Sequence, residues 1–269
     1  MVSPIISSIN NVESIIFPYE IEWMGSLLYS KNASKVGFQE FIKYYCDHTI
    51  YNQMMSRNSN FRLGDISTVL NKKDFMKYFK RLFRRGDNLI PKIINDEKPI
   101  LCLTTNHLSF FIEEILLALE GRCLFLETVR DPIYMFKQVK IFFKDVYTKN
   151  PKKFFTFTFN LNKENFLFYD YYNKNDNLTN LNNIDNLNHY CVNHLEKIFN
   201  FYFNLNFEDI NTRKSKLILL PFENFVTNPD IWINDILNFL DQVKTSNLKS
   251  ELKKQNVPRK VLTQGLKEK

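Results

Sequence analysis

The chain has 269 residues, of which 44% are hydrophobic and 24% are charged, and its formal net charge is +7. These values permit a buried hydrophobic core, in one sizeable α/β domain or two small ones. They exclude the class of proteins that are too small to form such a core. The positive charge favours anionic partners, but it does not distinguish nucleotides from nucleic acid or lipid.

The four cysteines are widely scattered and form no C-x-x-C pair: Cys46, Cys102, Cys123 and Cys191. This spacing argues against a zinc site and against a disulfide scaffold, and no metal ligand set is predicted. Cys102 and Cys123 lie in apolar runs, which predicts buried, reduced thiols.

No segment at the start of the chain resembles a secretory leader, because Met1 is followed by a mixed polar and apolar stretch. The longest apolar run, residues 110–119, is interrupted by Glu113 and Glu114 and is too short to span a bilayer. We therefore expect a soluble, cytoplasmic protein without a membrane span.

The first third of the sequence is mostly helical in pattern. Apolar or aromatic residues recur every three or four positions in residues 21–29, 38–51 and 73–83, as in amphipathic helices. The compact apolar run at 99–103 predicts a strand, with residues 104–107 at its carboxyl end.

A parallel βαβ unit is predicted next. A helix over residues 110–119 and a turn at 120–122 lead to a second strand, which ends at Arg130. His107 and Arg130 are then expected at the same edge of one parallel sheet flanked by helices.

The region of about residues 151–190 is rich in aromatic residues and Asn, and we interpret it as an insertion. Helical spacing resumes at 193–203, and residues 216–220 form a third strand candidate. Pro229, with Thr227 or Asn228 as a cap, predicts the start of another helix. A basic tail follows from residue 249.

Arg130 lies where a strand is predicted to end and a helix to begin. In open α/β sheets the ligand lies beyond the carboxyl ends of the strands, and a guanidinium fork there can bind phosphate oxygens. The alternative is a surface ion pair between Arg130 and Asp131.

Three stretches together resemble the sulfotransferase family, in family order: residues 103–107 (Leu-Thr-Thr-Asn-His), 129–132 (Val-Arg-Asp-Pro) and 219–229 (Leu-Leu-Pro-Phe-Glu-Asn-Phe-Val-Thr-Asn-Pro). The resemblance covers roughly residues 98–240. It implies one sulfotransferase-like domain over residues 1–269, of the P-loop nucleotide-binding class. The implied reaction moves a sulfuryl group from 3'-phosphoadenosine 5'-phosphosulfate to a hydroxyl or amine acceptor, without a metal.

The resemblance also implies roles for individual residues. Arg130 and Gln138 would contact the 3'-phosphate, although the family usually has Ser where this chain has Gln138. The ring of Phe222 would lie against adenine, with a core Phe as the alternative. Arg259 and Lys260, followed loosely by Gly265, resemble the element that clamps the same phosphate.

His107 corresponds to the family's catalytic base, which takes the proton of the acceptor hydroxyl. The alternative is a histidine that is merely hydrogen-bonded at the end of a strand. Glu113 and Glu114 are fallback bases, or else the polar face of a helix.

One expected element is missing from the sequence. The family cradles the 5'-phosphosulfate in a loop of the type Pro-Lys-Ser-Gly-Thr-Thr. No stretch upstream of His107 matches it; Gly25-Ser26 is the nearest candidate, and residues 15–20 resemble the family's segment just after the loop and its helix. We therefore expect the first strand and its loop to be absent from this chain.

The sequence leaves two functions other than sulfuryl transfer: binding without catalysis, and binding of nucleic acid. The missing loop favours a non-catalytic relative that binds a nucleotide or a partner. Binding of nucleic acid is not expected, because the Phe/Thr alternation in residues 154–159 is typical of a strand and not of base stacking.

Overall fold

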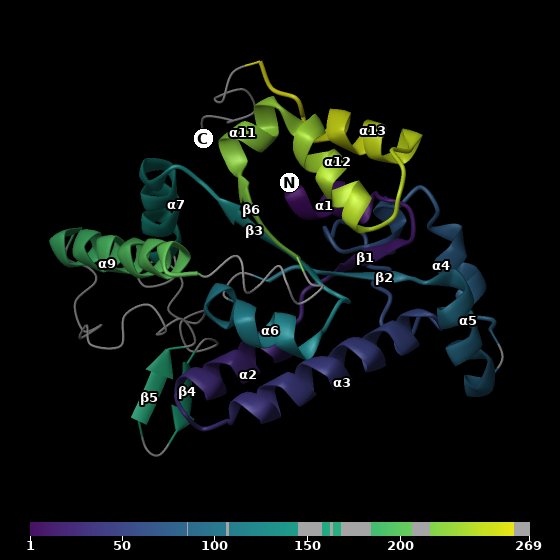
Figure 1. Cartoon of the computed structure of the whole chain (residues 1–269), viewed down its shortest axis with the longest axis horizontal. Coiled ribbons are helices and arrows are strands. Elements are labelled where there is room, and N and C mark those ends of the chain that lie inside the picture. The colour runs from purple at the N-terminus through teal and green to yellow at the C-terminus, as the bar shows by residue number, and fades with distance from the viewer. Residues whose placement is uncertain are drawn as a thin grey trace. The chain divides into compact units, whose positions relative to one another are not determined.

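Figure 1 shows the computed structural model of the chain, which describes residues 1–84, 86–105, 108–144, 158–161, 164–167, 184–205 and 216–260. For residues 158–161, 164–167 and 184 only the backbone is described. Helices and short strands follow one another along the chain, and two of the three strand pairs are parallel. The predicted mixed α/β class is therefore confirmed.

The chain forms two compact units, each built from separate stretches of sequence. The first unit contains Met1–Ile21, Gln39–Asn106 and Glu223–Lys269, and the second contains Glu22–Phe38 and His107–Phe222. Two such units can belong to one domain, and the single domain over residues 1–269 stays a prediction.

The first unit combines one parallel strand pair with several short helices. In chain order its elements are α1 (Val2–Ser7), β1 (Val12–Ile16), most of α3 (Lys35–Gln53), η1 (Val69–Asn71), α4 (Met76–Arg81), η2 (Asp87–Leu89), α5 (Ile90–Glu97), β2 (Ile100–Leu103), most of α11 (Phe222–Thr227), α12 (Pro229–Phe239) and α13 (Ser246–Lys254).

The second unit combines another parallel strand pair with an antiparallel hairpin and helices. Its elements are most of α2 (Tyr19–Tyr29), η3 (Ser109–Phe111), α6 (Ile112–Ala118), β3 (Leu124–Val129), α7 (Pro132–Lys144), β4 (Thr158–Leu161), β5 (Glu164–Leu167), α9 (Ile184–Phe203) and β6 (Lys216–Pro221).

Most of the predicted elements exist, with different ends. The helices expected at 21–29, 38–51 and 73–83 correspond to α2, α3 and the shorter α4. The strands expected at 99–103 and 216–220 correspond to β2 and β6. Pro229 is the first residue of α12 and Asn228 its N-cap, but the Asn228 side chain makes no capping bond.

The pairing of the strands differs from the prediction. In the described part of the chain, β2 pairs in parallel with β1, and β3 pairs in parallel with β6. The βαβ unit that joins residues 100–103 and 124–129 in one sheet is therefore wrong. Strand β1 was not predicted, because two of its five residues, Glu13 and Ser14, are polar and yet buried.

The polar side chains of β1 are satisfied inside the first unit. Glu13 accepts two hydrogen bonds from Arg81, at 2.8 Å from Nη1 and 3.0 Å from Nη2. Ser14 Oγ accepts from Gln53 Nε2 at 2.8 Å, and the Ser14 N–H donates to Tyr78 Oη at 3.0 Å. Because buried polar groups are tolerated when they are bonded, these contacts anchor α3 and α4 to the strand.

In the second unit, α7 and α9 pack against each other around a small apolar core. The buried side chains of this core are Phe143, Leu187, Tyr190 and Cys191. His194 is buried beside them, and its ring lies edge-on to Phe143 with 5.4 Å between centroids. Burial, with a smaller contribution from the charge of Lys197, lowers the pKa of His194 to about 3.

This buried histidine is expected to make the protein less stable in mild acid. The unfolded chain binds a proton at His194 near pH 6.5, whereas the folded protein does so near pH 3, so acidification favours unfolding. Between pH 7.5 and pH 5 the loss from this group is about 2 kcal/mol. Urea unfolding of the wild type and of His194→Leu at both pH values measures it.

The exposed His189 on the same helix provides the control. His189→Gln should leave the pH dependence of unfolding as in the wild type, and His194→Leu should reduce it by about 2 kcal/mol. Equal pH dependence in all three proteins would contradict a buried, uncharged His194.

The described helices contain none that is both long enough and apolar enough to cross a membrane.

Candidate functional site

Arg130 occupies the junction that the sequence predicts, between the end of β3 at Val129 and the start of α7 at Pro132. Asp131 shapes this junction: its Oδ1 accepts a hydrogen bond from the Ile133 N–H at 2.9 Å, and its carbonyl accepts from the Met135 N–H at 3.0 Å. Asp131 therefore works as the cap of the helix, with Pro132 in the first turn, where a missing N–H does no harm.

Phe222 comes to Arg130 because of the strand register. In the parallel pair β3–β6, Val129 lies opposite Pro221, so the next residue of each strand leaves the sheet at the same edge. The guanidinium carbon of Arg130 lies over the Phe222 ring, 4.5 Å from its centroid. This distance is within the range of a cation–π contact.

Helix α7 contributes two further groups. Tyr134 and Gln138 are four residues apart, so they share one face of the helix. Gln138 Oε1 accepts a hydrogen bond from Arg130 Nη1 at 3.0 Å, and the Tyr134 ring centroid is 5.9 Å from the guanidinium carbon. The structure thus brings together three of the residues that the sequence nominated: Arg130, Gln138 and Phe222.

The arrangement has the chemistry of an anion site with an aromatic wall. The bond to Arg130 uses the oxygen of the Gln138 amide, which leaves its NH₂ group as a donor for another acceptor. A guanidinium fork beside an amide donor suits a phosphate group. Because the guanidinium already covers one face of the Phe222 ring, a purine would have to stack on the other face.

A half-buried carboxylate on β3, that of Glu127, was missed in the sequence. Glu127 accepts hydrogen bonds from Tyr202 Oη at 2.7 Å and from Ser109 Oγ at 3.0 Å, which joins β3 to α9 and η3. Burial raises the pKa of this carboxyl group above its ordinary value, against the effect of the two hydroxyl donors. The available signal was an acidic residue inside the apolar run of residues 124–129.

The candidates for a catalytic base are only partly described. His107 lies outside the described residues, so its role stays a prediction. Glu113 is exposed on α6, and the buried Glu114 forms an ion pair with Lys35 Nζ at 2.5 Å. This ion pair, chiefly through its hydrogen bond, raises the pKa of Lys35 and engages Glu114 in a structural contact.

Arg259 and Lys260 belong to the first unit, whereas Arg130 belongs to the second. The Arg259 N–H donates to the Val226 carbonyl at 2.6 Å, and its Nη2 lies 3.2 Å from Met1 Sδ. Lys260 is exposed. Their predicted contact with the same phosphate as Arg130 stays a prediction, and Gly265 lies outside the described residues.

No group of three or more His, Cys, Asp or Glu side chains that could hold a metal ion occurs in the part of the chain that the structure describes. Comparison with protein-family models, with curated proteins and with solved structures finds no match to this chain.

Proposed function

We propose that this chain is a sulfotransferase-like protein of the P-loop nucleotide-binding class, which binds 3'-phosphoadenosine 5'-phosphosulfate at the Arg130 site. The sulfuryl group of this donor would pass to a hydroxyl or amine acceptor. The observation that carries the proposal is the convergence of Arg130, Gln138 and Phe222, from two separate segments of the chain. Arg130 Nη1 lies 3.0 Å from Gln138 Oε1, and the guanidinium carbon lies 4.5 Å from the Phe222 ring centroid.

This convergence supports the proposal because each residue matches one part of the donor. Arg130 and the NH₂ group of Gln138 would bind the 3'-phosphate, as a charged fork and a neutral donor. Phe222 would supply the flat apolar face for adenine. The order of these groups along the ligand follows from the resemblance, in which the Arg and the aromatic residue serve the same nucleotide.

The catalytic step needs a base that takes the proton of the acceptor. In the proposal His107 has this role, because a histidine of ordinary pKa accepts a proton near neutral pH. The oxygen of the acceptor then attacks the sulfur in line with the leaving phosphate, as in phosphoryl transfer. Arg259 and Lys260 would add positive charge around the 3'-phosphate.

A non-catalytic nucleotide-binding relative is the second candidate, and one observation favours it. Gly25-Ser26, the nearest candidate for the phosphosulfate loop, lies inside helix α2. A Cβ atom on Gly25 would come within 2.8 Å of the Phe111 ring, and Ser26 Oγ donates to the Glu22 carbonyl at 3.1 Å. Gly25 therefore allows close packing against the Phe111 ring. Because Gly25-Ser26 does not form a loop, no predicted segment binds the 5'-phosphosulfate of the donor.

The test is a calorimetric titration with 3'-phosphoadenosine 5'-phosphate, with adenosine 5'-monophosphate as the control ligand. We expect saturable binding of the bisphosphate and at least about tenfold weaker binding of the monophosphate, which lacks the group that Arg130 would hold. No binding, or equal binding of both ligands, would contradict the proposal. A sulfate-transfer assay then separates the enzyme from the non-catalytic relative.

A further inference from the structure

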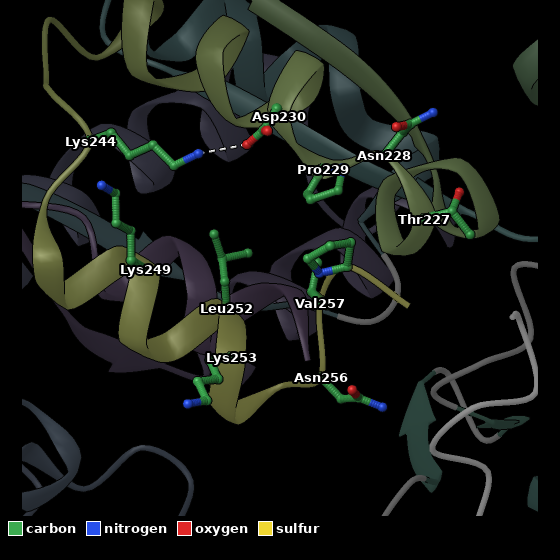
Figure 2. A pocket seen from close by; sticks show the side chains of 11 residues that line it. Thr227, Asn228, Pro229, Asp230, Lys244, Lys249, Leu252, Lys253, Asn256 and Val257 are labelled. Atoms are coloured by element: carbon green, nitrogen blue, oxygen red, sulfur yellow. Dashed lines mark hydrogen bonds and ion pairs between the residues drawn. The ribbon is translucent and has the colours of Figure 1, made fainter. Parts of the chain in front are cut away.

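A pocket of about 560 Å³ opens in the first unit, between the start of α12, helix α13 and the chain that follows it. Figure 2 shows the side chains around it. Its volume lies within the range of sites that hold small organic molecules. Every residue that lines it belongs to the first unit.

The apolar part of the lining comes from residues that are themselves well packed. Pro229 is buried at the start of α12, Leu252 is buried on α13, and Val257 is buried in the following segment. Pro258 adds a further apolar surface. A ligand in this pocket would therefore contact apolar groups as well as polar ones.

The charged residues that line the pocket are mostly positive. Three lysines, Lys244, Lys249 and Lys253, line the pocket together with a single carboxylate, Asp230. Lys244 Nζ pairs with Asp230 Oδ1 at 2.6 Å, as the dashed line in Figure 2 marks. In the part of the chain that the structure describes, Lys249 and Lys253 have no ion-pair partner, so two positive charges remain.

The excess positive charge on α13 is unfavourable when no anion is bound. Lys249 and Lys253 are one turn apart on the helix, where like charges repel. The one acidic residue of this helix, Glu251, instead contacts Lys254 at 3.7 Å and Gln255 at 2.8 Å. A bound anion between Lys249 and Lys253 would remove the repulsion.

We propose that this pocket binds a small organic anion, a phosphate monoester on an apolar or aromatic group. The phosphate would lie against Lys249 and Lys253, and the apolar group would contact Leu252 and Val257. The proposal does not depend on the nucleotide site, because none of the residues that line the pocket is assigned to that site.

The test uses phenyl phosphate as the probe, titrated into the full chain at low salt and followed by calorimetry and NMR. We expect saturable binding that weakens as salt is added, since the lysines are exposed. Inorganic phosphate, which lacks the apolar group, and phenol, which lacks the charge, should both bind at least about fivefold more weakly.

Neighbouring lysines of α13 provide matched variants. Lys253→Gln and Lys249→Gln should each weaken binding of phenyl phosphate by about fivefold. Lys254→Gln removes the same charge from the same helix but does not line this pocket, so it should change the affinity by less than about twofold. Equal losses for Lys253→Gln and Lys254→Gln would overturn the proposal.

Two further measurements distinguish this site from others. Saturation with 3'-phosphoadenosine 5'-phosphate, and the variant Arg130→Ala, should leave the affinity for phenyl phosphate unchanged; competition by the nucleotide would overturn a separate site. The protein could instead sediment with phosphatidylcholine vesicles that contain phosphatidic acid and fail to bind phenyl phosphate. This result would overturn the small-molecule ligand in favour of a lipid headgroup.

Discussion

Replacement of Arg130 by Ala is expected to lower the affinity for 3'-phosphoadenosine 5'-phosphate by about 100-fold. The variant removes the guanidinium that would bind the 3'-phosphate, and it also releases the Gln138 amide from its 3.0 Å hydrogen bond. Arg130→Lys keeps the charge without the planar fork, so an intermediate loss of about tenfold is expected. Calorimetric titration of both variants measures these losses.

Arg122 provides the matched control for this experiment. It precedes strand β3 and is exposed, so Arg122→Ala removes the same charge from the region before the strand. Its affinity for the nucleotide should stay within about twofold of the wild type. If Arg130→Ala retained both its folded circular dichroism spectrum and the wild-type affinity, the nucleotide assignment would be wrong.

Arg81→Met should destabilise the protein by about 3–5 kcal/mol, the largest loss that we expect from a single substitution. Arg81 and Glu13 are 2% and 1% exposed in their side chains and share two hydrogen bonds. Although burial opposes it, the guanidinium of Arg81 holds the pKa of Glu13 below its ordinary value. Without Arg81, this buried carboxylate would lose its two shorter contacts and keep the longer one to Lys77 Nζ, at 3.4 Å. Urea unfolding measures the loss.

Arg84 offers the comparison, because it belongs to the same segment but pairs with a more exposed carboxylate. Arg84 Nη2 lies 2.7 Å from Glu97 Oε1, and the Glu97 side chain is 42% exposed. Arg84→Met should therefore cost less than about 1 kcal/mol. The double variant Glu13→Leu with Arg81→Met should recover much of the stability, since no buried charge remains. Equal losses for Arg81→Met and Arg84→Met would contradict this account.

Three of the strands of the two parallel pairs and seven helices (α2, α3, α4, α6, α7, α9 and α12) could be predicted, because their apolar residues follow the periods of helix and strand. Helices α1, α5, α11 and α13 were missed, and α13 covers the start of the segment that was expected to be a basic tail. The strand pairing could not be predicted, since it joins residues far apart in the sequence: β1 with β2, and β3 with β6. Strand β1 was missed for a local reason as well. Its buried Glu13 is compatible with a strand because Arg81, 68 residues later, and Lys77 neutralise it.

The site shows the same division between local and long-range information. Two short motifs nominated Arg130 and Phe222, and Gln138 was nominated by its position after the first of them. The register of β3 and β6 then explains why Arg130 and Phe222 meet. The hydrogen bond from the Ile133 N–H to Asp131 was harder to predict, because the role of Asp131 as a helix cap depends on where α7 begins. Glu127 was missed because its partners Ser109 and Tyr202 are remote in sequence.

The interleaving of the two units along the sequence has a consequence for synthesis on the ribosome. The first unit begins with Met1–Ile21 but also contains Glu223–Lys269, which is translated after every segment of the second unit. The early helix α1, which packs against α13 in the folded unit, must therefore remain in the nascent chain without this contact until α13 emerges. The second unit, which ends at Phe222, can finish folding first. A fragment that ends there should leave the first unit incomplete and exposed to chaperones.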